Sequence, residues 1–326
     1  MNYILKSKKL ILFAVIMLIS LCYIPHLKTE EVSTTIICTN SILADFTKNI
    51  LKDNVKIDYI MPAGACPIHF DASPSDVSKI SSADIIISLG IEPWLTDLLE
   101  NSDNTNYSEI KCYQLGEWNI PSGAKKYVKK LRDDLSIILP SNNNTIKANS
   151  KEYIEYINTT SENLKDMIKT NGFTGKKIIS MEWHKDFLEW LGLNVTYYYA
   201  SPERLSTRDI FNVTKAASVG DVCAIIDNLQ SGTDFGANIA SESGLIHLIF
   251  TNFPGAIPNT DTYIDMITYN NQQLINGITA YESKKGEIAD LENRISALEI
   301  ERNIILLGII ILVLFSCIMI ILYKKK

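Results

Sequence analysis

The stretch YIMPAGACPIHFDASPSDV, residues 59–77, decides the fold. A strand-like run over residues 55–60 predicts a strand, which the Met-Pro-Ala-Gly sequence ends. A loop with His69 follows, and the Pro-Ser-Asp sequence at 74–76 predicts the start of a helix. Because α/β sheets bind ligands at the carboxyl ends of their strands, His69 is well placed to contact a ligand. The alternative is that it is a solvent-exposed loop histidine.

Apolar runs and amphipathic segments alternate in two halves of the chain. In the first half, strands are predicted over 35–39, 55–60 and 83–89, with helices over 41–51, 74–81 and 92–101. In the second half, the predicted strands are 176–180, 194–199, 222–227 and 246–251, and the helices are 183–191, 207–218, 235–243 and 260–284. Such alternation predicts an α/β fold of two lobes with parallel sheets.

The segment between the two halves has a different pattern. Residues 122–139 and 144–169 both have helical periodicity, separated by a Pro-Ser-Asn sequence. The second helix would be roughly 40 Å long at 1.5 Å per residue. A helix of this length predicts a stiff link between the lobes.

Both ends of the chain are apolar. Lysines precede an apolar run over residues 10–24, which predicts a signal peptide or a signal anchor. Residues 304–322 carry no charge and are followed by Tyr323 and three lysines, as expected for a membrane-spanning helix whose lysines stay cytoplasmic. The sequence therefore predicts a single-pass C-terminal anchor, with the rest of the chain on the extracytoplasmic face.

A short heptad pattern precedes this apolar segment. Its apolar positions, spaced by three and four residues, are Ile288, Leu291, Ile295, Leu298 and Ile305, and Arg302 occupies one further position of the stripe. The pattern predicts either a helical coiled-coil stalk that forms a weak dimer, or one face of a helix packed on its own domain.

The predicted organisation follows from these patterns. It comprises a signal peptide or signal anchor (1–32), an N-terminal α/β lobe (33–120), a helical linker (121–173), a C-terminal α/β lobe (174–284), a helical stalk (285–303), a transmembrane helix (304–323) and a cytoplasmic tail (324–326).

Composition excludes some classes of function. The net charge of −6 argues against binding to nucleic acid. The sequence has no Gly-x-Ser-x-Gly, phosphate-binding glycine loop or His-Glu-x-x-His motif, so we do not expect an enzyme. His247 and the tryptophans Trp94, Trp183 and Trp190 lie at core spacing and are predicted to be structural.

Five stretches carry a resemblance to a known family. They are residues 37–50, 59–77, 82–95, 181–195 and 251–270, and their order and the long central helix also agree. The chain resembles the metal-binding solute-binding proteins of ABC importers, the cluster A-I that contains zinc- and manganese-binding lipoproteins. The resemblance implies two lobes that hold one divalent metal in a cleft and deliver it to an ABC permease.

The resemblance also implies a ligand set, with one residue from each of four loops. His69 stands where the first histidine of the family stands, and Glu117 is the nearest replacement for the second. For the third position, Glu182 is the first choice and His184 the alternate. Asn252 stands where the family has an aspartate.

One imidazole, two carboxylates and an amide favour harder ions such as manganese or iron over tight zinc binding. Zinc or manganese remains the expected transported ion. Cys66 precedes His69 by three residues, so it is either a soft-metal ligand or the disulfide partner of Cys38, and the extracytoplasmic location favours the disulfide.

Two alternative functions remain open. Asn228 and Gln230 follow a buried strand, so the cleft would instead hydrogen-bond a metal chelate or a small organic solute. The scaffold would otherwise serve as a surface adhesin or sensor without transport.

Overall fold

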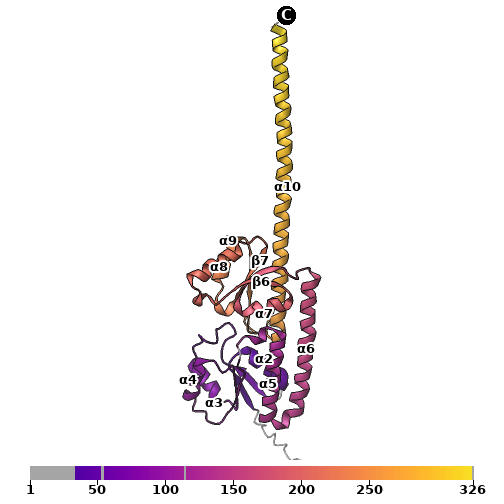
Figure 1. The fold of residues 1–326 in the computed structure, drawn as a ribbon. Helices are drawn as coiled ribbons and strands as arrows, with labels where there is room; N and C mark the ends of the chain where they lie inside the picture. Colours follow the sequence, from indigo (N-terminus) through magenta and orange to yellow (C-terminus); the bar gives the residue numbers. More distant parts are fainter. Residues whose placement is uncertain (1–33, 53–54, 114, 325–326) are drawn as a thin grey trace, which may run out of the picture. The chain divides into compact units, whose positions relative to one another are not determined.

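The computed structural model describes residues 34–52, 55–113 and 115–324, with side chains up to Ile320 (Figure 1). The signal segment predicted over residues 1–32 lies outside these residues. Two sheets of four parallel strands form the two lobes. The first sheet has the order β2-β1-β3-β4 and the second the order β6-β5-β7-β8, so each lobe repeats one topology. The prediction of two α/β lobes is therefore confirmed.

The strands are short and lie close to their predicted positions. In the first lobe they are β1 (Thr35–Cys38), β2 (Lys56–Tyr59), β3 (Ile85–Ser88) and β4 (Ser108–Lys111). In the second lobe they are β5 (Lys177–Met181), β6 (Asn194–Tyr199), β7 (Val222–Asn228) and β8 (Ile246–Phe250). Residues of β3 and β7 are buried throughout, as expected for the inner strands of parallel sheets covered on both faces.

Helices connect the strands, because parallel neighbours need a crossover. The first lobe contains α2 (Ser41–Leu51), α3 (Pro74–Ser81) and α4 (Pro93–Asn101), and the second contains α7 (Glu182–Leu191), α8 (Thr207–Ala217) and α9 (Asp234–Ser243). Capping side chains stabilise the N-termini of two of these helices. The Asn40 side chain accepts from the N–H of Leu43 at α2, and Ser206 and Asp209 form a capping box at α8.

Two antiparallel helices lie between the lobes in the chain. They are α5 (Pro121–Ile138) and α6 (Asn143–Thr170), joined by the 3₁₀ turn η3 (Pro140–Asn142). Helix α6 has 28 residues and buries one face, which includes Ile146, Ile157 and Ile168. The long central helix predicted from the sequence is therefore present.

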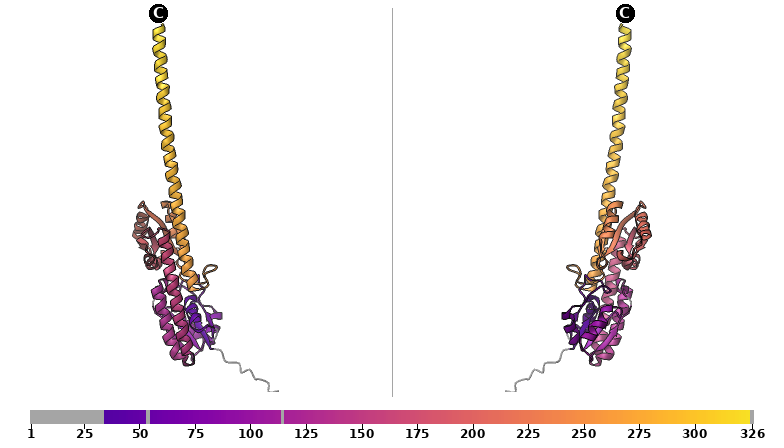
Figure 2. Two further views of the ribbon diagram at one scale, coloured as in Figure 1. Left: turned by 90° about the vertical axis from the view of Figure 1, so that its right-hand side faces the viewer. Right: turned by 90° about the vertical axis from the view of Figure 1, so that its left-hand side faces the viewer.

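The last helix is longer than the predicted lobe-closing segment. Helix α10 (Tyr263–Lys324) runs without a break through the end of the lobe, the stalk and the apolar segment (Figure 2). Gly277 allows close packing on β8, because a Cβ there would lie 2.6 Å from Cδ2 of Leu248. Ile278 is fully buried, whereas the described side chains from Ser283 onward are exposed.

Asp45 of α2 is a junction between three parts of the fold. Its carboxylate accepts hydrogen bonds from the Tyr153 hydroxyl of α6 and from the backbone N–H of Tyr263, both at 3.1 Å. Burial raises the pKa of Asp45 to about 6, and these hydrogen bonds act in the opposite direction. The start of α10 is therefore bound to the first lobe by a buried carboxylate.

Candidate functional site

A cavity of about 240 Å³ lies between residues of the two lobes. The loops that line it follow β2, β4, β6, β7 and β8, at the carboxyl ends of the strands, where parallel sheets bind ligands. Its lining is Cys66, Pro67, Ile68, His69, Leu115, Gly116, Trp118, Trp183, Ser201, Glu203, Arg204, Asn228, Gln230, Ser231, Asn252 and Phe253.

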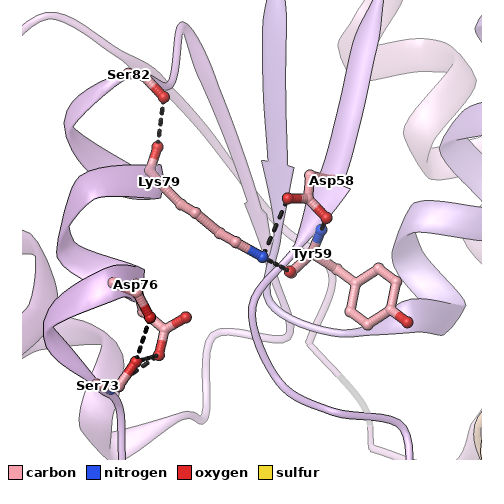
Figure 3. Close-up of polar contacts among 7 residues, drawn as sticks. Asp58, Tyr59, Ser73, Asp76, Lys79 and Ser82 are labelled. Carbon is pink, nitrogen blue, oxygen red and sulfur yellow. Dashed lines mark hydrogen bonds and ion pairs between the residues drawn. The ribbon is translucent and has the colours of Figure 1, made fainter.

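The loop that carries His69 is fixed at both ends. At its start, Nζ of Lys79 in α3 donates to the Tyr59 carbonyl at 2.9 Å and pairs with Asp58 at 3.0 Å (Figure 3). At its end, Ser73 and Asp76 form the capping box of α3. These bonds hold both ends of the segment that faces the cavity.

His69 itself is exposed, and its backbone N–H donates to the Cys66 carbonyl at 3.1 Å in a turn. The turn directs both residues to the cavity lining. Trp94 of α4 also holds the loop, because its Nε1 donates to the Pro67 carbonyl at 2.9 Å. His69 therefore projects from a supported loop, as a binding residue requires.

The favoured Cys38–Cys66 disulfide is wrong for this structure, in which both cysteines are free. Cys38 is fully buried, and its thiol lies 4.0 Å from the Thr47 hydroxyl of α2, in the core of the lobe. Cys66 is half-buried and lines the cavity instead. Strand adjacency suggested the pair, but the Cys38 side chain packs toward α2. Burial also raises the pKa of the Cys38 thiol well above its ordinary value.

Three amide side chains of the second lobe line the cavity, but most of their polar atoms already have partners. Gln230 donates from Nε2 to the Ala63 carbonyl at 2.8 Å and accepts from the Asn252 N–H at 3.1 Å. Asn228 donates to the Ser231 hydroxyl at 2.9 Å. The Oδ1 atom of Asn252 accepts from Nδ2 of Asn119 at 2.9 Å. Gln230 and Asn119 thereby connect the two lobes beside the cavity.

The two predicted carboxylates lie at the edge of the site and not in its lining. Glu117 pairs with Lys126 at 3.4 Å, and Glu182 pairs with Arg204 at 2.9 Å. Their chain neighbours Gly116 and Trp183 line the cavity instead. Each carboxylate thus forms an ion pair with a basic side chain of the protein.

The alternate ligand His184 is fully buried behind the cavity. Its Nε2 lies 3.3 Å from Oδ1 of Asn228, and its ring packs edge-on against Phe250. Burial lowers the pKa of His184 to about 3, so the ring is neutral at physiological pH. His184 is therefore not in the lining itself but lies next to Asn228, which is.

The structure thus brings together His69, Asn252, Asn228, Gln230 and Cys66, and leaves Glu117, Glu182 and His184 outside the lining. Within the part of the chain that the structure describes, no three His, Cys, Asp or Glu side chains are grouped closely enough to hold a metal ion. The cavity offers one imidazole, one thiol and the carboxylate of Glu203, beside the Arg204 guanidinium, amides and aromatic rings.

Aromatic residues of the wall were not predicted as site residues. Trp183, expected in the core, is half-buried and lines the cavity, and Trp118 donates from Nε1 to the Asn252 carbonyl at 2.8 Å. Phe253 packs against Trp118 with ring centroids 5.5 Å apart. Trp183 and Phe253 lie within three residues of a strand end, which was the available signal, and helical spacing obscured it at Trp183.

The fold and the cavity between the lobes define a two-lobed solute-binding protein. The chain belongs to the family described as ZnuA, zinc-uptake complex component A periplasmic, whose model matches residues 36–277. The match covers both lobes and the helices between them.

Curated relatives agree with this family. The manganese-binding lipoprotein MntA of Halalkalibacterium halodurans is 26% identical over 264 residues, which cover 75% of this chain and 88% of the relative. The manganese ABC transporter substrate-binding lipoprotein PsaA of Streptococcus pneumoniae is 26% identical over 278 residues, covering 74% and 88%.

Solved structures show the same fold. A periplasmic metal-binding protein from Candidatus Liberibacter asiaticus superposes with a TM-score of 0.64 at 18% identity, over 76% of this chain and all of that one. A crystal structure of ZnuA superposes with a TM-score of 0.63 at 16% identity, over 76% of this chain and 99% of that one.

Proposed function

We propose that this chain is an extracytoplasmic solute-binding protein that delivers a divalent metal ion, of the zinc, manganese or iron class, to an ABC permease. The relatives are named as manganese-binding and manganese ABC transporter lipoproteins, and solved structures with the same fold are described as Mn-bound or Cd-bound. The protein would perform no covalent chemistry, and its action would be capture and release of its cargo.

The observation that carries this proposal is the position of His69. Its imidazole is exposed on the supported loop after β2 and lines the cavity that both lobes share. Imidazole is a common ligand for zinc, manganese and iron, and a first ligand on one lobe with Asn252 on the other would let a cation bridge the two.

We also propose that α10 anchors the protein in the membrane. Among the described residues, this helix is the one long and apolar enough to span a bilayer, and its most apolar window has a mean hydropathy of 3.0 with no buried residue. The lysines at 324–326 would stay on the cytoplasmic side. The anchor would hold the lobes outside the cell, near the permease.

Titration of chelator-stripped protein with MnCl₂ and ZnCl₂ tests the metal proposal. We expect a single site whose affinity falls about tenfold or more in His69→Ala, because each lost ligand removes at least about 1.4 kcal/mol. Glu155→Gln, a change at an exposed carboxylate on α6, is the matched control and should bind normally. Equal affinities in the parent and in His69→Ala would refute the role of His69.

A second candidate cargo is a metal chelate. Glu117 and Glu182 are paired with protein cations, Oδ1 of Asn252 already accepts from Asn119, and the walls are aromatic. A chelate brings most of its own ligands, so His69 alone would complete the coordination while the organic part contacts Trp118 and Trp183.

Manganese citrate, compared with MnCl₂ and with free citrate, separates the two cargoes. Tighter binding of the complex than of either component supports the chelate. Binding of MnCl₂ that added citrate weakens supports the bare ion.

A further inference from the structure

The stalk of α10 carries an apolar stripe without a partner inside the described chain. At heptad spacing it contains Ile288, Leu291, Ile295 and Leu298, whose exposed fractions lie between 47% and 63%. No other described element packs on residues 283–303, where every side chain is exposed. The sequence left open whether this face packs on its own domain, and the structure answers that it does not.

We propose that this stripe is the interface of a parallel two-stranded coiled coil between two copies of the chain. Ile288 and Ile295 occupy the a positions, and Leu291 and Leu298 occupy the d positions. Ile at a with Leu at d is the combination that favours two parallel strands over three or four. The occupant of the stripe is therefore a second copy of this chain.

Charges beside the stripe agree with a parallel arrangement in register. In this arrangement a g residue faces the e residue five positions later on the other helix. Arg294 at g then faces Glu299 of the second copy, and the pair occurs twice by symmetry. The preceding g–e pair, Glu287 with Glu292, is a like-charged pair, so the charges permit a weak dimer and not a strong one.

Arg302 marks the C-terminal end of the interface. It occupies the next a position, one heptad after Ile295, and would face its own copy across the seam. A charged residue at a reduces stability while it fixes register and the number of strands. The stripe resumes at Ile305, at the edge of the apolar segment.

Continuity with the membrane segment explains how a short coiled coil can form. Residues 283–303 extend about 30 Å at 1.5 Å per residue, directly before the segment proposed to span the bilayer. This step rests on the proposed anchor: two copies inserted in one membrane have parallel stalks at equal height. Confinement to the bilayer raises their effective concentration, so a contact that is weak in solution becomes populated.

Cysteine cross-linking of the full chain in phosphatidylcholine vesicles tests the dimer. In a background with Cys22→Ser, Cys66→Ser and Cys317→Ser, Leu298→Cys places a thiol on the seam and Ser296→Cys places one on the opposite face. Because a disulfide requires Cβ atoms roughly 4 Å apart, we expect about fivefold more cross-linked dimer for Leu298→Cys. Equal cross-linking at the two positions, or none at either, would overturn the proposal.

Energy transfer between labelled copies in the same vesicles gives a second readout. The double change Ile295→Glu with Leu298→Glu should abolish the transfer, whereas Asn293→Glu with Ser296→Glu should leave it unchanged. Arg302→Leu should increase it. Loss of transfer in both double variants would show that added negative charge separates the copies wherever it lies on the stalk. That result would contradict a defined seam.

The vesicle experiment also separates this proposal from the previous ones. Recovery of the chain in the vesicle fraction after alkaline washing reports the anchor independently of cross-linking. Metal titration of the parent chain, which keeps Cys66, in matching vesicles reports the cargo. A vesicle-bound, metal-binding chain that does not cross-link at Leu298→Cys would refute the dimer alone.

Discussion

Each lobe buries one aspartate with a tyrosine hydroxyl, but the two carboxylates stabilise different things. In the second lobe, Asp227 of β7 accepts from the Tyr199 hydroxyl at 2.5 Å and lies 2.8 Å from Nε2 of His247. These three residues belong to β6, β7 and β8 of one sheet, in which β5 lies between β6 and β7. In the first lobe, Asp45 instead connects α2 with α6 and with the start of α10.

The difference separates local from long-range stabilisation. The partners of Asp227 lie 28 and 20 residues away in the chain, whereas those of Asp45 lie 108 and 218 residues away. The second lobe is therefore stabilised by a polar group within itself. In the first lobe, the buried carboxylate instead connects α2 with α6 and with the start of α10, two helices that also contact the second lobe.

The largest expected effect comes from crowding the aspartate of the second lobe. A Cβ at Gly236 of α9 would lie 2.1 Å from Oδ2 of Asp227, so Gly236→Ala must displace a buried, fully bonded carboxylate. We expect a loss of about 3 kcal/mol in the free energy of unfolding, measured by chemical denaturation.

Gly286→Ala is the matched control, since a Cβ there meets nothing within 4 Å in the exposed stalk. It should leave the unfolding of the lobes unchanged. A tolerated Gly236→Ala would mean that Asp227 can move, and the two lobes would then differ less than the structure indicates.

Removal of the tyrosine hydroxyls compares the two aspartates directly. Tyr199→Phe removes a short bond to a fully buried carboxylate and should cost about 2 kcal/mol. Tyr153→Phe removes a 3.1 Å bond to Asp45, which retains the Tyr263 N–H, and should cost about 1 kcal/mol. Thermal unfolding of both variants beside the parent measures the difference, and the reverse order would contradict it.

An effect as small as that of Tyr153→Phe is expected from a pH dependence specific to the first lobe. Asp45 has a pKa of about 6 in the folded protein against an ordinary value of 3.8, so the folded state binds this proton more tightly than the unfolded state. Its contribution to stability is therefore greatest at low pH and is lost as pH rises through about 6. Between pH 5 and pH 7.5 the loss should be about 1 kcal/mol.

Asp45→Asn removes this titration while it keeps an oxygen that can accept both hydrogen bonds. Denaturation of the parent and the variant at pH 5 and pH 7.5 should show that the pH-dependent difference shrinks by about 1 kcal/mol in Asp45→Asn. An unchanged pH dependence would assign the titration to another group.

The sequence was sufficient for the fold because its signals are local. Strand runs, Pro and Gly breaks and helix caps lie next to the elements that they define, as at residues 59–77 and at α8. The placement of His69 was predictable for the same reason, since a loop after a strand end can be read directly. The end of the second lobe was less clear, because helical periodicity continues through residue 284 into the stalk.

The rest of the site depends on partners that lie far apart in the chain. Glu182 turns to Arg204, 22 residues later, and Gln230 bonds to Ala63, 167 residues earlier. Cys38 and Cys66 lie on neighbouring elements, yet Cys38 packs toward Thr47. Residue type and spacing could not predict these side-chain partners, because each contact depends on how one element packs on another.

Helix α10 also decides how the protein bears mechanical force. With α10 anchored as proposed, a pull from the membrane would act along the axis of this helix, which continues from the stalk into its contacts with the lobes (Figure 2). The contacts at Glu282 with Lys176, at Gly277 with Leu248 and at Tyr263 with Asp45 would then be loaded together in shear. A tether attached in this way resists peeling, because no single turn of the helix takes the whole load.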